Sequence, residues 1–182
     1  MAVNQLRAAG AAPIVAVDPV ESRRKRALEL GADYAFDPFC EDFVQQVKAV
    51  CGGGVNVAIE VTGVGSGLNG TLDCMKRFGR VALLGCTRNS DFSVDYYRKV
   101  HGPGISLIGA HTQARTETDS FSGMWTTADD IRAQLRLLAM KRLHYGGLVE
   151  EVHSPLECKA VYARLLTEKS FPIVQFDWRT ME

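Results

Sequence analysis

The stretch from Pro13 to Pro38 constrains the fold of this chain most strongly. An apolar run of strand length ends at Asp18, a charged segment of helical length follows, and a second short run ends at Asp37. Parallel strands need a crossover connection between them, which is usually a helix, so this order is typical of a parallel sheet. The stretch therefore predicts half of a parallel α/β sheet.

Asp18 follows directly on the first predicted strand, and this position allows two roles. Ligands of an open parallel sheet collect at the carboxyl ends of its strands, where a carboxylate can accept hydrogen bonds from the ribose hydroxyls of an adenosine. Aspartate is also a favoured N-cap, so Asp18 could instead cap the helix that follows. The residue type alone leaves both roles open.

Four consecutive basic residues, Arg23 to Arg26, fall in the first turns of that predicted helix. A cation near the N-terminus of a helix is unfavourable by about 0.3–1 kcal/mol because of the helix macrodipole. An anion or a flat ring lying over the helix start would compensate this cost. The alternative is a solvated, exposed face, which is the usual fate of a charge run. We expect at least Arg23 to touch a ligand.

Composition excludes several classes of function. With 182 residues, 46% of them hydrophobic, the chain can bury one substantial core. Its 21 basic and 21 acidic residues cancel, which argues against a nucleic-acid or anionic-membrane partner. No apolar run approaches the roughly 18 residues of a membrane span, and the N-terminus does not resemble a signal peptide. We expect a cytoplasmic protein.

Cysteines and histidines do not form a recognisable metal motif. The five cysteines include no C-x-x-C pair, and the four histidines lack paired metal spacing. The cysteines fit small buried residues or unreactive thiols in a reducing compartment. We expect no metal site in this chain.

The remaining sequence alternates between helical and strand patterns, with no internal repeat. This alternation predicts a doubly wound parallel α/β sheet with right-handed crossovers. We assign residues 1–145 to this domain and residues 146–182 to a C-terminal strand-helix-strand unit. No strand or glycine-rich turn precedes the helix that begins at Met1, so we expect a sheet without its first strand. The elements expected outside the first stretch are helices at Met1–Ala9, Glu41–Cys51, Leu68–Phe78, Tyr96–Lys99, Thr127–Lys141 and Pro155–Thr167, and strands at Val55–Val61, Arg80–Cys86, Ile105–His111, Leu148–Val152 and Pro172–Phe176.

Several short segments, in their order and spacing, resemble a known family. They are Val17-Asp18-Pro19, Ala27–Asp33, Glu60-Val61-Thr62-Gly63, Gly79–Gly85 and Leu107–Ala110. Nearly the whole chain resembles the C-terminal, cofactor-binding half of the medium-chain dehydrogenases, the family of zinc-dependent alcohol, sorbitol and threonine dehydrogenases. The resemblance implies an oxidoreductase that moves a hydride between an alcohol or polyol carbon and NAD. It also implies that the zinc sites and catalytic groups lie on another, N-terminal domain, so we expect no catalytic residue here.

The resemblance also implies which residues bind the cofactor. Asp18 would bind the adenine ribose and Arg23 would flank it. Three segments would surround the nicotinamide end: Val61, Thr62 and Gly63 below its ribose, the backbone of Leu84, Gly85 and Cys86, and the backbone of Ala110, His111 and Thr112. A 2′-phosphate would face Asp18, and like charges about 4 Å apart repel by about 1 kcal/mol in water and about 4 kcal/mol at a dielectric of 20. We therefore expect a preference for NAD over NADP.

Further expectations concern the assembly. By resemblance, the two C-terminal strands pack onto the catalytic domain, these 182 residues alone are inactive, and the full-length enzyme is a homo-oligomer. By the same resemblance, we expect a substrate of the polyol and threonine branch of the family. Two other classes stay open on the residues themselves. One is a non-catalytic nucleotide-sensing module, and the other is a methyltransferase with an adenosyl cofactor, which also places an acid after its second strand.

Overall fold

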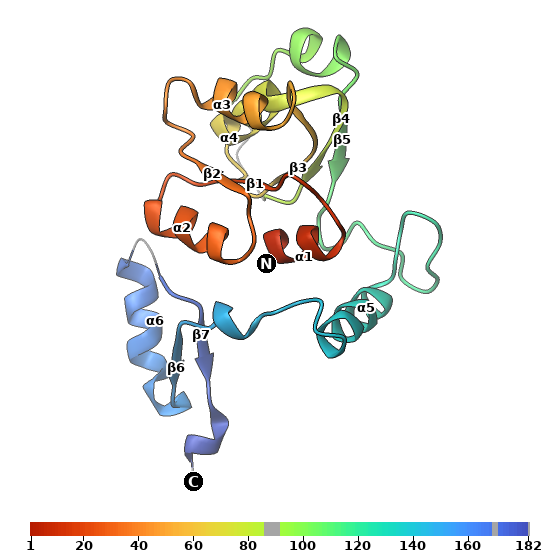
Figure 1. The fold of residues 1–182 in the computed structure, drawn as a ribbon. Helices are drawn as coiled ribbons and strands as arrows, with labels where there is room; N and C mark the ends of the chain where they lie inside the picture. The colour runs from red at the N-terminus through yellow and green to blue at the C-terminus, as the bar shows by residue number, and fades with distance from the viewer. Residues whose placement is uncertain (86–91, 169–170, 182) are drawn as a thin grey trace.

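The computed structural model describes residues 1–85, 92–168 and 171–181, and its helices and strands alternate along the chain (Figure 1). The labelled strands pair in parallel, which confirms the expected α/β class. The helices are α1 (Ala2–Ala8), α2 (Glu21–Glu29), α3 (Phe43–Val50), α4 (Gly65–Cys74), α5 (Thr127–Ala139) and α6 (Cys158–Thr167). The strands are β1 (Val15–Val17), β2 (Tyr34–Phe36), β3 (Val55–Glu60), β4 (Met75–Leu83), β5 (Ser106–Gly109), β6 (Glu151–His153) and β7 (Val174–Phe176).

The first five strands form two separate parallel sheets, β1-β2 and β3-β4-β5. A doubly wound sheet has the strand order 3-2-1-4-5-6. If β1 to β5 of this chain correspond to strands 2 to 6 of that order, the place between the two sheets is that of strand 1. Within the described residues, no backbone hydrogen bond joins β1 to β3. Val17 and Val57 are 45% and 49% exposed, although parallel strands are normally buried on both faces. We call this place the β1–β3 slot.

Two apolar clusters hold the sheets and helices together. Leu72, Met75, Val81 and Ile105 form one cluster between α4 and the β3-β4-β5 sheet. The other is built from Phe43, Val47 and Cys74, and packs against residues of β1, β2 and β3. Since it contacts both sheets, the second cluster keeps them together across the slot. Helices α3 and α4 lie on one side of the strands, and α1 and α2 on the other (Figure 1).

The boundary between α4 and β4 differs from the sequence prediction. The predicted helix ended at Phe78, before Gly79, but α4 ends at Cys74 and β4 begins at Met75. Cys74 and Met75 are only 5% and 8% exposed, so their burial fixes where the chain changes direction. A Cβ at Gly54 would lie 2.9 Å from the carbonyl oxygen of Cys74, which shows how closely the two segments pass. Packing overrides the local helical pattern here.

The C-terminal unit consists of β6, α6 and β7, and lies apart from the other strands (Figure 1). Its two strands pair in parallel, Glu151 opposite Val174 and His153 opposite Phe176. The segment before it is tied to α1, where Oδ1 of Asn4 accepts a hydrogen bond of 3.0 Å from the backbone N–H of His144. No helix of the described ranges is long and apolar enough to cross a membrane.

Candidate functional site

Parallel pairing places most of the predicted cofactor-binding residues at the carboxyl ends of strands. Asp18 and Asp37 follow the paired strands β1 and β2. In the other sheet, Val61–Gly63 follow β3, Leu84 and Gly85 follow β4, and Ala110–Thr112 follow β5. Arg23 lies on α2, and Cys86 lies outside the described residues.

The carboxylate of Asp18 stabilises the turn before α2. Its Oδ1 accepts a hydrogen bond of 2.8 Å from the backbone N–H of Val20. Val20 itself is the N-cap of α2, and no side chain caps this helix. Asp18 therefore acts before the cap rather than as the cap. Its second oxygen has no partner in the part of the chain that the structure describes, so it is available to a ligand.

Arg24 joins the ends of β1 and β2. Its Nη1 donates one hydrogen bond of 2.7 Å to the carbonyl oxygen of Asp18 and another of 3.0 Å to Oδ2 of Asp37. The side chain of Arg24 is only 19% exposed, so the alternative of a solvated face does not hold at this position. Asp37 compensates the cation near the helix start. A signal in the sequence could have suggested this pair, because Asp37 follows its strand as Asp18 follows the first.

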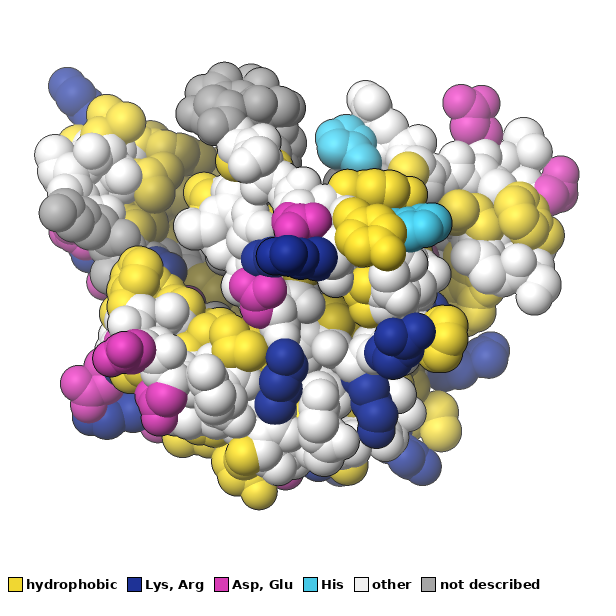
Figure 2. All heavy atoms as spheres, turned by 90° about the horizontal axis from the view of Figure 1, so that it is seen from above, with side chains coloured by type: hydrophobic (Ala, Val, Ile, Leu, Met, Phe, Trp, Pro, Cys, Tyr) yellow, Lys and Arg dark blue, Asp and Glu magenta, His cyan; other side chains and the backbone are white. Residues whose placement is uncertain are grey.

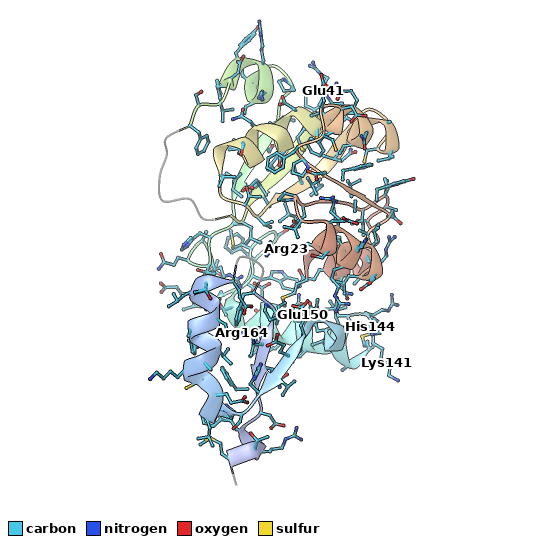
Figure 3. All side chains as sticks on the ribbon, turned by 90° about the vertical axis from the view of Figure 1, so that its left-hand side faces the viewer. Arg23, Glu41, Lys141, His144, Glu150 and Arg164 are labelled. Carbon is cyan, nitrogen blue, oxygen red and sulfur yellow. The ribbon has the colours of Figure 1, made fainter. Side chains whose placement is uncertain are left out.

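Arg23 differs from its neighbour. Its side chain is exposed and, within the described ranges, makes no hydrogen bond or ion pair. In Figure 3 it extends from α2 at the level between the sheets and the C-terminal unit. Because none of the described residues binds this exposed side chain, it is accessible to a ligand.

Glu60 joins the ends of β3 and β4, a role that the sequence analysis missed. The residue is 5% exposed. Its carboxylate accepts hydrogen bonds from the backbone N–H groups of Thr62 and Gly63 at 2.7 and 3.1 Å, and from the Thr62 hydroxyl. Its carbonyl oxygen accepts from the N–H groups of Leu84 and Gly85 at 2.9 and 2.8 Å. An acid at the end of an otherwise apolar strand was the available signal.

Two glycines allow these strand ends to approach each other. Gly63 has a φ of +67°, in the left-handed region that favours glycine. A Cβ at Gly85 would lie 2.3 Å from the nitrogen of Gly63 and 2.7 Å from Oε2 of Glu60. Glycine is therefore required at position 85. This packing keeps the two backbone segments of the predicted nicotinamide end in contact.

The internal hydrogen bonds limit what these segments can offer a ligand. The N–H groups of Leu84 and Gly85 are occupied by Glu60, and the N–H of Ala110 donates to the carbonyl oxygen of Leu83 at 3.1 Å. Among the described residues, no turn or side-chain hydrogen bond to the carbonyl oxygens of Leu84, Gly85 or Ala110 is formed. Nδ1 of His111 accepts a hydrogen bond of 3.1 Å from the N–H of Gln113, so the imidazole stabilises its own turn.

Thr112 contributes to a hollow of about 380 Å³ between the loop after β5 and α5. Arg115, Asp130, Ile131 and Leu135 also line it, and Arg115 forms an ion pair with Asp130. This hollow does not include Asp18 or the turn at Thr62–Gly63. The structure thus places Thr112 beside a space separate from the other predicted residues.

No metal centre is formed by the described residues, because no three His, Cys, Asp or Glu side chains gather to hold an ion. Burial raises the pKa of the Cys74 thiol to about 11. Cys40 and Cys158 are exposed. The buried thiol belongs to the apolar cluster under α3 and is unsuited to be a nucleophile.

A charged cluster ties β6 to α6 in the C-terminal unit. The guanidinium of Arg164, on α6, contacts both carboxylate oxygens of Glu151 at 2.8 and 3.0 Å. Arg164, and secondarily His153, hold the pKa of Glu151 down at about 2. Nε2 of His153 lies 2.8 Å from Glu151, which raises the pKa of the imidazole above its usual 6.5. These contacts stabilise the unit and include none of the predicted cofactor-binding residues.

Comparison with known proteins identifies the family. Residues 1–130 match the sequence profile of the zinc-binding dehydrogenases. The chain belongs to this family. An L-threonine 3-dehydrogenase of Pyrococcus furiosus is 41% identical over 104 residues, which are 57% of this chain and 30% of that enzyme. The chain thus aligns with about a third of the length of this curated relative.

Solved structures of zinc-binding dehydrogenases and their relatives share this fold. The benzyl alcohol dehydrogenase of Acinetobacter calcoaceticus superimposes with a TM-score of 0.77 and 24% identity over 97% of this chain and 46% of its own. An alcohol dehydrogenase of Escherichia coli CFT073, solved with NADH, gives 0.75 and 13% identity over 97% of this chain and 48% of its own. The family profile and the threonine dehydrogenase match support the cofactor-binding portion over the methyltransferase and sensor alternatives, and the solved structures show the shared fold.

Proposed function

We propose that this chain is the cofactor-binding part of an NAD-dependent dehydrogenase that oxidises an alcohol or polyol. Asp18 carries the proposal: it follows β1, and the described residues use one of its two carboxylate oxygens. Membership of the zinc-binding dehydrogenases supports this assignment. The NADH bound to the E. coli relative supports the choice of cofactor.

The residues fit NAD in three respects. The available oxygen of Asp18 suits a ribose hydroxyl, with the exposed Arg23 beside it. Val61 and Thr62 are exposed at the end of β3, where a nicotinamide ribose could lie on them. Carbonyl oxygens at Leu84–Gly85 and Ala110 are suited to accept from a carboxamide NH₂. When bound, NAD accepts the hydride from the alcohol carbon.

The chain's own contribution is binding and orientation. Glu60 fixes the turn that would lie under the nicotinamide, and Asp18 would select a cofactor with a free 2′-hydroxyl. The described residues do not suit zinc, so we derive no step through the metal and assign its ligands to a part of the enzyme outside this chain. These residues orient the cofactor and do not perform the proton transfer.

The wider assignment follows from the same proposal. We assign residues 1–145 to cofactor binding and 146–182 to contact with the catalytic domain. The threonine dehydrogenase relative supports a small hydroxylated substrate of the polyol and threonine branch. We place the enzyme in the cytoplasm as a homo-oligomer without nucleic-acid or membrane partners. The balance of 21 basic and 21 acidic residues supports the absence of an anionic partner, and the one face drawn in Figure 2 carries basic, acidic and apolar side chains.

Titration of Asp18→Ala tests the central assignment. In the 182-residue chain, NAD binding followed by amide chemical shifts should be in the millimolar range, because the phosphate-binding turn is not part of it. The substitution removes charge-assisted hydrogen bonds to the ribose and should weaken binding by about 1.5–3 kcal/mol. Asp33→Asn, which removes a charge before β2, is the control. A lower melting temperature with unchanged NAD affinity would show that Asp18 serves only the turn.

A further inference from the structure

The geometry at the ends of β1 and β2 points to a specificity device: the Arg24–Asp37 ion pair sets the discrimination against a 2′-phosphate on the adenosine. This inference rests on the proposed function, because it requires the adenosine ribose to lie at Asp18. It assigns a role to two residues that do not themselves bind the ribose hydroxyls.

Arg24 is placed to act on a group bound at Asp18. Its Nη1 lies 2.7 Å from the carbonyl oxygen of Asp18, so the cation sits beside the residue that would face the ribose. The same nitrogen lies 3.0 Å from Oδ2 of Asp37. The two side chains are only 19% and 27% exposed, so water screens this pair less than a surface ion pair.

The balance of three charges then decides which adenosine is accepted. Asp18 and Asp37 carry one negative charge each and Arg24 carries one positive charge, which leaves a net negative charge at the strand ends. A 2′-phosphate adds about −1.5 to −2 at pH 7 and is repelled. Without Asp37, the charge of Arg24 would balance that of Asp18, and the strand ends would repel the phosphate less. Asp37 therefore pairs with Arg24 and leaves the charge of Asp18 unopposed, which strengthens the discrimination against NADP.

The chain offers a matched control on the same strand. Asp33 lies directly before β2, as Asp37 lies directly after it, and Asp33 also pairs with an arginine, Arg7, at 2.7 Å. Asp33→Asn and Asp37→Asn thus remove the same charge and the same kind of ion pair at opposite ends of β2. Only the second change lies at the carboxyl end, where the ribose is proposed to bind.

The experiment compares two probes that differ only in the 2′-phosphate, adenosine 5′-monophosphate and adenosine 2′,5′-bisphosphate. Both are titrated into the isotopically labelled 182-residue chain, and the amide of Val20, which donates to Asp18, is the reporter. Wild type should favour the monophosphate. Asp37→Asn should shift the ratio of dissociation constants towards the bisphosphate roughly fivefold, from removal of one charge several ångströms away in a high dielectric. Asp33→Asn should shift it less than twofold.

A second variant keeps the proposal testable if Asp37→Asn does not fold. Arg24→Gln should move the ratio in the opposite direction, towards the monophosphate, and the double variant should return it close to wild type. The proposal is wrong if either single variant leaves the ratio unchanged, or if both move it in the same direction. If the monophosphate does not shift the Val20 amide of wild type, the proposed ribose site fails, and this inference fails with it. Monophosphate binding with no effect of the variants overturns this inference alone.

Discussion

Replacing Glu60 with glutamine tests whether one buried carboxylate holds the turn at Thr62–Gly63 after β3. The side chain is 5% exposed and accepts from two backbone N–H groups at 2.7 and 3.1 Å. Glutamine has the same shape but keeps only one acceptor oxygen. In either orientation of the amide, its NH₂ group faces one of the two backbone N–H donors, of Thr62 or of Gly63. That N–H donor then has no acceptor. The substitution therefore removes a hydrogen bond without opening a cavity.

The magnitude follows from the character of these hydrogen bonds. A bond to a charged group contributes about 1.5–3 kcal/mol, and a buried donor left without a partner costs about 1–3 kcal/mol. The lost hydrogen bond and the unpaired donor describe largely the same change, so the two energies are not added. We expect Glu60→Gln to lower the free energy of unfolding by about 2–3 kcal/mol. For a chain of this size the melting temperature falls by about 2–4 °C for each kcal/mol, which gives a decrease of about 4–12 °C.

Urea unfolding at pH 7, followed by circular dichroism, measures the effect, and hydrogen exchange at the amides of Thr62 and Gly63 locates it. Glu29→Gln is the matched control, because Glu29 is a glutamate with a 62% exposed side chain, paired with Arg26 at 2.8 Å. Loss of this surface pair should change stability by less than about 0.5 kcal/mol. If Glu60→Gln is as stable as Glu29→Gln and exchange at the turn is unchanged, the carboxylate does not hold the turn at Thr62–Gly63.

Three further outcomes are expected. The pKa of Glu151 lies at about 2, below its usual 4.5, so its ion pairs stabilise the C-terminal unit above about pH 4.5 and are lost as the pH falls towards 2. The raised pKa of His153 adds stability below its usual 6.5 that is lost as the pH rises through the folded value; His153→Gln should remove only this second change in a titration of amide exchange. Cys40 and Cys158 should react with a thiol reagent at pH 8, whereas Cys74, with its pKa raised to about 11, should react only on unfolding. The unpaired edges of the β1–β3 slot should make the 182-residue chain self-associate with rising concentration, without dehydrogenase activity, and a monodisperse monomer in sedimentation would contradict this.

Local patterns were sufficient to predict the fold class. The apolar runs ending at Asp18 and Asp37, with a charged helical segment between them, predicted the parallel pair β1–β2 that the structure contains. The two strands are joined by a single helical crossover, so both strands and their helix lie within one continuous stretch of sequence. The sheet without its first strand was predicted from a different observation, that neither a strand nor a glycine-rich turn comes before the first helix. Among the described residues, β1-β2 and β3-β4-β5 are indeed separate sheets.

The end of α4 could not be predicted, because the local sequence favours a longer helix whereas long-range packing ends it earlier. Gly79 is a plausible helix stop, yet the chain leaves the helix at Cys74, where burial against α3 and close passage over Gly54 fix the path. These contacts join segments about twenty residues or more apart, which no local pattern contains.

The sequence by itself determined the family, the parallel strands and the position of Asp18, since each depends on residue type and order over short distances. Only the tertiary structure decided how the strand ends are held. It showed that Asp18 accepts a hydrogen bond from Val20, that Arg24 pairs with Asp37, and that the backbone carbonyl of Glu60 joins β3 to β4. Which groups pair depends on how close the strand ends lie to each other and on how far the groups are buried. Both are set only when the strands have packed.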